Sequence, residues 1–140
     1  MVGILVIAHN GLGDSLQDCV RHVLGNAPAH LKAMSILADD DPQQKEMEAR
    51  VLLTQLDQGD GILVLTDVFG ATPSNIAKRL CKPGYIEGVS GVNLPMLLRV
   101  VSCSGKPLTE MVQRALDGGR DCIVTFNSED NDAATRCSDY

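Results

Sequence analysis

A histidine and an aspartate in this sequence combine the residue types and positions that nucleophilic chemistry requires. His9 directly follows an apolar run at 2–8, and Asp67 directly follows a second apolar run at 61–66. If both runs are strands of one open parallel sheet, their carboxyl ends share an edge, so both side chains reach the same crevice. An unprotonated imidazole nitrogen can attack phosphorus, while a carboxylate bonded to the other nitrogen fixes the tautomer of the ring. We therefore predict that His9 and Asp67 form a catalytic pair.

The segment after Asp67 predicts a place for the negative charge of a phosphoryl group. A glycine-containing loop leads to Thr72 and Pro73, a pair typical of a helix start. The first amides of a helix lack intrahelical partners and lie at the positive end of its dipole. Pro73 has no N–H, which leaves Ser74 and Asn75 as donors, while the Thr72 hydroxyl either caps the helix or binds the anion. Transfer between two imidazoles depends mainly on alignment and charge stabilisation, so we expect no metal ion and no cofactor.

Short apolar runs alternate with amphipathic stretches along the whole chain, which predicts strands separated by helices. We expect strands at 2–8, 33–37, 61–66, 85–92 and 122–126, and helices that begin near residues 12, 42, 72, 94 and 107. Asp41 before Pro42 predicts an N-cap, whereas Gly25 and the glycines at 118–119 are expected to end their helices. This alternation is typical of an α/β fold, here a doubly wound, mainly parallel sheet with helices on both faces.

The spacing of apolar residues also predicts which faces of two helices are buried. In the first helix the expected buried residues are Leu12, Leu16, Cys19, Val20 and Val23. In the second helix they are Met47, Val51, Leu52 and Leu56.

Composition limits the classes of protein to which this chain can belong. Its 140 residues suit one domain, and 44% apolar but only 3% aromatic residues predict an aliphatic core. A formal net charge of −6 argues against nucleic acid and anionic membranes, and it favours a basic protein partner. No apolar run approaches the roughly 20 residues of a spanning helix, so we expect a cytoplasmic protein without membrane insertion. The five cysteines lack paired spacing and are expected to be small apolar fillers.

Three stretches, 2–9, 65–75 and 91–97, resemble the signature segments of the mannose-type IIA component of the bacterial phosphotransferase system. The resemblance implies that His9 accepts a phosphoryl group from the phosphohistidine of HPr and hands it to a IIB domain. It also implies that Asp67 orients His9, and that Thr72 with the adjoining helix amides contacts the phosphoryl oxygens. The family fold implies a homodimer whose last strand, 121–126 here, is antiparallel or exchanged. Residues 1–126 would then form the IIA domain, and the polar residues 127–140 a flexible acidic tail.

The sequence departs from the family pattern in two places. The family usually has glycine directly after the histidine, whereas this chain has Asn10 followed by Gly11. Many sugar-transporting members continue into a IIB domain, and this chain carries only a short tail after its last predicted strand. We therefore expect the phosphoryl acceptor to be a separate IIB component or a regulatory target.

Three other functions fit parts of the pattern. The phosphoryl-donor subunit of dihydroxyacetone kinase shares the same resemblance, and its kinase partner would distinguish it. A non-catalytic anion- or nucleotide-binding regulatory module is suggested by the D-x-x-G spacing at 67–70, although the sequence has no G-x-x-x-x-G-K-[ST] loop. A hydrolase would use Ser74 or Ser15 as nucleophile, but no G-x-S-x-G elbow exposes either hydroxyl.

Four further residues receive weaker expectations. Phe69 is either an exposed anchor for HPr or a residue that packs in its loop. Arg99 is expected at a solvated helix position rather than at the phosphoryl group, and His22 and His30 are expected at the surface.

Overall fold

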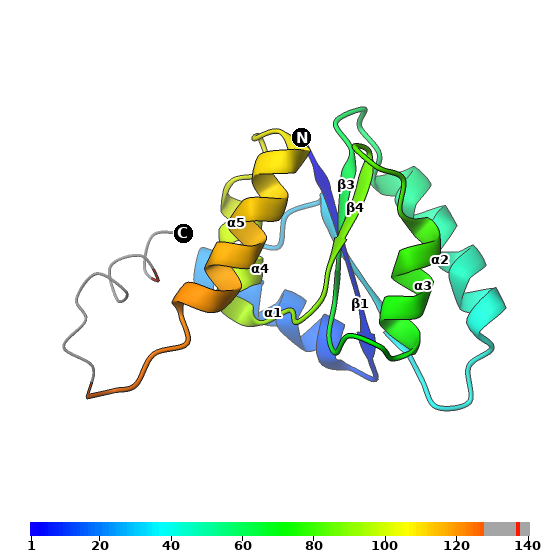
Figure 1. The fold of residues 1–140 in the computed structure, drawn as a ribbon, viewed down its shortest axis with the longest axis horizontal. Coiled ribbons are helices and arrows are strands. Elements are labelled where there is room, and N and C mark those ends of the chain that lie inside the picture. The colour runs from blue at the N-terminus through cyan, green and yellow to red at the C-terminus, as the bar shows by residue number, and fades with distance from the viewer. Residues whose placement is uncertain (128–136, 138–140) are drawn as a thin grey trace.

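The computed structural model describes residues 1–127 and 137, which form a parallel sheet between two layers of helices. The elements in chain order are β1 (Gly3–His9), α1 (Leu12–Leu24), β2 (Leu31–Ile36), α2 (Pro42–Leu56), β3 (Ile62–Thr66), α3 (Thr72–Leu80), β4 (Ile86–Val89), α4 (Leu94–Ser102) and α5 (Leu108–Asp121). The four strands are all parallel and lie in the order β2-β1-β3-β4. Helices α1, α4 and α5 cover one face, and α2 and α3 cover the other (Figure 1). The predicted doubly wound α/β fold is confirmed.

The central strands are aliphatic because both of their faces are covered. Alternate residues of β1 enter opposite cores: Ile4 and Val6 pack with α1, α4 and α5, whereas Leu5 and Ile7 pack with α2 and α3. β1 lies between β2 and β3, with Ile4 paired to both Leu31 and Leu63. The carboxyl ends of β1 and β3 therefore lie side by side at one edge of the sheet.

Local sequence signals fix several helix ends as expected. Asp41 caps α2 by accepting a hydrogen bond from the amide of Gln43 at 3.1 Å, with Pro42 in the first turn. Asn93, which was not predicted as a cap, also caps its helix, α4, by accepting a hydrogen bond from the amide of Met96. Gly25 ends α1 in a left-handed conformation with φ of 88°.

The predicted buried faces of α1 and α2 are partly wrong. Leu12, Cys19 and Val23 of α1 are exposed, and its buried residues are Gly13, Leu16 and Val20. In α2 the buried residues are Ala49, Leu53 and Leu56, whereas Met47 is 69% and Val51 59% exposed. Small residues explain both differences, because Gly13 and Ala49 let their helices approach the sheet closely. A Cβ at Gly13 would lie 3.2 Å from Ala33.

Helix α5 continues through Gly118 and Gly119 to Asp121, so the end predicted at these glycines is wrong. Both glycines face α4. A Cβ would lie 3.1 Å from Arg99 at the first position and 2.8 Å from Met96 at the second. The glycines therefore permit close packing of two helices instead of ending one.

The strand predicted at 122–126 does not form in the described structure. The chain leaves α5 irregularly, with Ile123 78% exposed and Phe126 fully exposed. Cys122 is disulfide-bonded to Cys137, and Cys19 and Cys81 are exposed, so these four cysteines are not apolar core fillers. Of the predicted tail, residues 128–136 and 138–140 lie outside the described residues.

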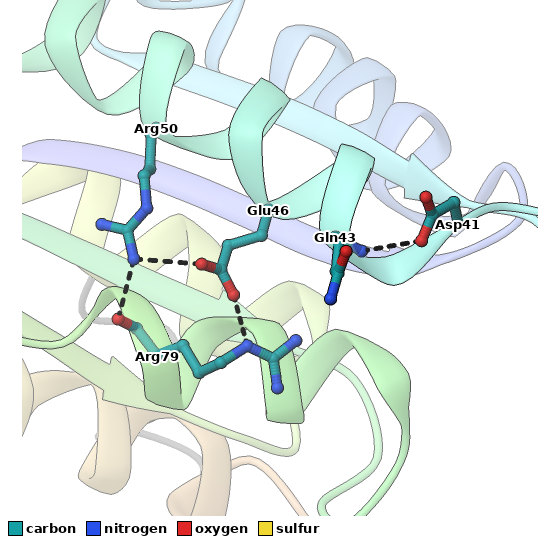
Figure 2. A network of polar contacts seen from close by, with 5 residues as sticks. All are labelled: Asp41, Gln43, Glu46, Arg50 and Arg79. Carbon is teal, nitrogen blue, oxygen red and sulfur yellow. Dashed lines mark hydrogen bonds and ion pairs between the residues drawn. The ribbon is translucent and has the colours of Figure 1, made fainter.

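A network of charged side chains joins α2 to α3 (Figure 2). The carboxylate of Glu46 accepts hydrogen bonds from Arg79 and, at 3.2 Å, from Arg50, which also donates to the main-chain carbonyl of Arg79. The guanidinium groups of Arg79 and then Arg50 lower the pKa of Glu46. Such exposed pairs contribute little stability, but they link the two helices on this face. None of the described helices has the length and apolar character needed to cross a membrane.

Candidate active site

His9 and Asp67 meet at the edge where β1 and β3 end. His9 is the last residue of β1, and Asp67 is the first residue after β3. One carboxylate oxygen of Asp67, Oδ2, accepts two hydrogen bonds from His9: 2.9 Å from its main-chain amide and 2.7 Å from ring Nδ1. This double contact fixes both the backbone and the ring of the histidine relative to the carboxylate.

The hydrogen bond also fixes the tautomer of the imidazole. A carboxylate can only accept, so Nδ1 must carry the proton and Nε2 of the neutral ring keeps its lone pair. The His9 side chain is 44% exposed, while Asp67 is 13% exposed beneath it. The imidazole is therefore partly open to solvent, whereas the carboxylate that it contacts is largely buried.

The carboxylate of Asp67 is held in its charged form. Partial burial alone would raise the pKa of Asp67, but the hydrogen bonds from the amide and ring of His9 outweigh burial and lower this pKa below the ordinary 3.8. The second oxygen, Oδ1, is buried and has no hydrogen-bond partner among the described residues. The main-chain amide of Val68 makes a further, smaller contribution that lowers the pKa of Asp67.

A sharp turn after β1 keeps the imidazole at the surface. Asn10 has a φ of +51°, the left-handed region that asparagine tolerates better than most residues. Its amide donates to the carbonyl of Ile36 in β2 at 2.9 Å, and Gly11 is then the N-cap residue of α1. Asn10 thus makes the turn at the position where the family usually has glycine.

The loop between β3 and α3 organises the predicted anion-binding residues differently from the sequence expectation. Ala71 rather than Thr72 is the N-cap of α3. The hydroxyl of buried Ser74 accepts from the Gly70 amide at 2.8 Å and donates to the Ala71 carbonyl at 2.9 Å. The main-chain amide of Asn75 donates to the same carbonyl at 3.0 Å. The other polar groups at this helix start are the amides of Thr72 and Ser74, the Thr72 hydroxyl and the exposed side chain of Asn75.

The loop that follows β4 is hydrogen-bonded to the backbone of Asp67. The amide of Gly91 donates to the main-chain carbonyl of Asp67 at 2.6 Å, and the amide of Val92 donates to that of Thr66 at 2.9 Å. The sequence predicted Gly91 and Val92 as the end of a strand and did not indicate their contacts with Thr66 and Asp67. The available signal was a glycine two residues after a short strand and two residues before the Asn93 cap.

Arg99, His22 and His30 make no contact with His9 or Asp67 among the described hydrogen bonds and ion pairs. Arg99 is only 11% exposed and lies 3.6 Å from Asp121, so the expected solvated position is wrong. His22 is exposed as expected, but His30 is half-buried and its Nε2 lies 2.6 Å from the Ser104 hydroxyl. Burial, followed by the N-terminal ammonium, lowers the pKa of His30.

Phe69 is 66% exposed beside the site, with the ammonium of Lys78 4.5 Å from its ring centroid. Its neighbour Val68 is also exposed. The proton of the Ser74 hydroxyl is directed at a carbonyl rather than at a base, which disfavours the hydrolase hypothesis. Among the described residues no group of three or more histidine, cysteine or acidic side chains is arranged to hold a metal ion.

Solved structures of phosphotransferase IIA proteins share this fold. The EIIA component from Streptococcus agalactiae aligns with a TM-score of 0.78 and 24% identity, over 90% of this chain and 98% of its own. The mannose/sorbose-specific IIA subunit from Enterococcus faecalis aligns with a TM-score of 0.78 and 19% identity, over 91% and 96% of the two chains. The architecture is therefore that of the IIA components of the sugar phosphotransferase system.

Sequence comparison assigns the family. The chain belongs to the EIIA-man family, described as PTS system fructose IIA component, whose sequence pattern matches residues 3–116. The mannose-specific EIIAB component of Escherichia coli K12 is 30% identical over 80 residues, which are 55% of this chain and 25% of that protein. The fructose-specific EIIA component of Bacillus subtilis 168 is 25% identical over 103 residues, 73% of this chain and 70% of its own length. The resemblance found in the sequence is thereby confirmed.

Proposed function

We propose that this IIA component is a phosphocarrier that is phosphorylated on Nε2 of His9. The phosphoryl group comes from the phosphohistidine of HPr and passes to a separate IIB component or a regulatory target. The observation that carries the proposal is the double hydrogen bond from His9 to Asp67 Oδ2, because it leaves Nε2 unprotonated on a side chain that is 44% exposed. Membership of the EIIA-man family supports the same direction of transfer.

The transfer exchanges one phosphorus–nitrogen bond for another. The lone pair of His9 Nε2 attacks phosphorus as the bond to the donor imidazole breaks, and the electron pair of that bond stays on the donor ring. The proton on Nδ1 of His9 remains in the hydrogen bond to Asp67. The ring gains positive charge as the new bond forms, and the adjacent carboxylate stabilises that charge. Because the bonds exchanged are alike, the reaction can run onward to the acceptor by the same steps in reverse.

In this proposal hydrogen-bond donors of the protein, rather than a metal ion, bind the phosphoryl oxygens. We assign this role to the amides of Thr72 and Ser74 and to the Thr72 hydroxyl, with the side chain of Asn75 nearby. The start of α3 has no side-chain cap and lies at the positive end of the helix dipole, which supports this assignment. The buried hydroxyl of Ser74 has a different task, since its two hydrogen bonds hold the loop in shape.

The surroundings of His9 suit a protein donor. Leu12, Leu37, Val68 and Phe69 are exposed apolar residues that follow the carboxyl ends of β1, β2 and β3. The acidic loop at 39–41 lies on the same edge, directly after β2. An apolar patch bordered by acidic residues fits a partner with an apolar centre and a basic rim, which is the character we assign to HPr.

We also propose a homodimer that exchanges the segment 121–126. The outer edge of β4 has no strand partner among the described residues. Beside it lies a groove of about 470 Å³, lined by residues that include Val89, Leu116 and Ile123. The exposed apolar side chains after α5 would be covered if the segment paired with the β4 edge of a second copy. In this proposal residues 1–126 form the IIA domain, 127–140 form a tail, and the protein acts in the cytoplasm.

Phosphorylation in a reconstituted system tests the function. The chain is incubated with labelled phosphoenolpyruvate, enzyme I and HPr, and the expected product carries one acid-labile phosphoryl group. His9→Ala should abolish labelling, whereas His22→Ala, a matched change at an exposed histidine, should leave it intact. Unlabelled wild-type protein, or a labelled His9→Ala variant, would contradict the proposal. Loss of the label to dihydroxyacetone kinase subunits rather than to a IIB component would identify the alternative acceptor.

A further inference from the structure

The loop that follows β4 holds the backbone on which Asp67 is mounted. The last strand pair between β3 and β4 is Leu65 with Val89. Beyond that pair the amide of Val92 bonds the Thr66 carbonyl at 2.9 Å, and the amide of Gly91 bonds the Asp67 carbonyl at 2.6 Å. Two hydrogen bonds thus continue the attachment past the end of the sheet, as far as the residue that orients His9.

Gly91 reaches this geometry only because of its backbone conformation. Its φ is +82°, in the left-handed region that L-residues with a Cβ rarely adopt. A Cβ built there would meet no atom within 4 Å. The glycine is therefore required by conformation and not by space, so a substitution perturbs the hydrogen bond without introducing a clash.

The loop is anchored on its other side as well. Asn93 caps α4 through the Met96 amide, and its side-chain nitrogen donates to the Gly119 carbonyl of α5 at 3.0 Å. A shift of residues 91–92 is consequently resisted by two helices. The Asp67 residue is then fixed at two points, through its carbonyl by this loop and through Oδ2 by His9.

We propose that Gly91 is a positioning residue for the phosphoryl transfer. By holding the Asp67 carbonyl, it sets the direction of the carboxylate and hence the orientation of the His9 ring. This inference rests on the proposed function for its kinetic consequence, but its structural consequence, the strength of the Nδ1 to Oδ2 hydrogen bond, is independent of it. Small losses of alignment matter, because transfer in line between two imidazoles depends on geometry.

The chain supplies a matched control at the opposite end of the same strand. Gly84 precedes β4, has a φ of +79° and, like Gly91, would place a Cβ in open space. Its amide donates to the side chain of Glu87 and not to the site. Gly91→Ala and Gly84→Ala therefore introduce the same kind of backbone strain, one beside Asp67 and one remote from it.

The experiment compares both variants with wild type by two measurements. NMR of the ¹⁵N-labelled imidazole reports the Nδ1–H hydrogen bond of His9, and rapid-quench labelling reports the rate of phosphorylation by phospho-HPr. We expect Gly91→Ala to weaken the hydrogen bond and slow phosphorylation on the order of tenfold. Gly84→Ala should lose comparable thermal stability yet remain within about twofold of the wild-type rate. Gly91→Asn should recover most of the rate, because asparagine tolerates positive φ as Asn10 does here.

Each outcome bears on the inference. If Gly91→Ala matches Gly84→Ala in both the imidazole spectrum and the rate, Gly91 is only a turn residue and the proposal is overturned. If wild type is not phosphorylated at all, the proposed function fails. The imidazole spectra of the two alanine variants then still decide whether Gly91 positions Asp67.

Discussion

Replacing Asp67 by asparagine tests the central part of the site with little change in shape. The amide oxygen can occupy the position of Oδ2 and still accept from the amide and Nδ1 of His9, at 2.9 and 2.7 Å in wild type. The negative charge is removed, so both hydrogen bonds change from charge-assisted to neutral. The amide nitrogen then takes the position of Oδ1, which is buried and has no partner among the described residues.

The two hydrogen bonds should affect different quantities. Hydrogen bonds to charged groups contribute about 1.5–3 kcal/mol and neutral ones about 0.5–1.5 kcal/mol, so each bond weakens by about 1 kcal/mol. The main-chain bond is present before and during transfer, and its weakening lowers the free energy of unfolding. The Nδ1 bond strengthens as the ring becomes positive, so its weakening slows phosphorylation by roughly fivefold to tenfold. Asp67→Ala removes this bond entirely and should slow the reaction by roughly 10-fold to 150-fold.

The assay is rapid-quench transfer from ³²P-labelled HPr, with urea unfolding measured in parallel on the same preparations. The reasoning requires the rates to fall in the order wild type, Asp67→Asn, Asp67→Ala, with all three above the His9→Ala background. Wild-type rates for both Asp67 variants would refute the electrostatic role of the carboxylate. Equal losses in the two variants would contradict the expected order and show that only the charge of the carboxylate matters, since the neutral hydrogen bond kept by asparagine would then contribute nothing.

Three further results are expected. Phe69→Ala should raise the KM for phospho-HPr about tenfold, with kcat and the free energy of unfolding nearly unchanged. The reason is that this 66% exposed ring contributes contact area for the partner and no core packing. An unaltered KM would exclude Phe69 as an anchor for HPr. Gly3→Ala should cost about 1–3 kcal/mol in urea unfolding, since its Cβ would lie 2.9 Å from the Leu56 carbonyl oxygen. Gly105→Ala, in open space, should stay within about 1 kcal/mol of wild type, and equal unfolding midpoints for the two variants would contradict this reasoning. The folded-state pKa of Asp67 is lowered, so the ionised carboxylate stabilises the fold fully above the ordinary value of 3.8, and this contribution is lost as the pH falls through the folded pKa. The difference in free energy of unfolding between wild type and Asp67→Asn should therefore shrink in acid. A pH-independent difference would contradict a stabilising role for the charged carboxylate.

Much of the architecture follows from short-range sequence patterns. Aliphatic runs such as 61–66 indicate strands covered on both faces, and the Asp41–Pro42 pair marks a helix start wherever the helix packs. The positions of His9 and Asp67 at strand ends were readable for the same reason, since parallel strands bring their carboxyl ends to one edge. These features depend on conformational preferences that act over a few residues.

Other features depend on what a residue meets across the fold. Gly118 and Gly119 carry a typical helix-ending signal, yet α5 continues through them because α4 packs against that face. In α2 the small residue Ala49 is buried while Met47 and Val51 are exposed, which apolar spacing alone does not reveal.

The candidate site also has features that the sequence predicts and features that depend on tertiary packing. The sequence by itself determined that a histidine and an acid stand at the ends of two buried strands, ahead of a helix start. Only the tertiary structure decided that one oxygen of Asp67 binds both the amide and the ring of His9, and that the Gly91 amide holds that residue from behind. Hydrogen bonds between residues far apart in the chain depend on distances and angles of a few tenths of an ångström and a few degrees, which packing sets and residue type does not encode.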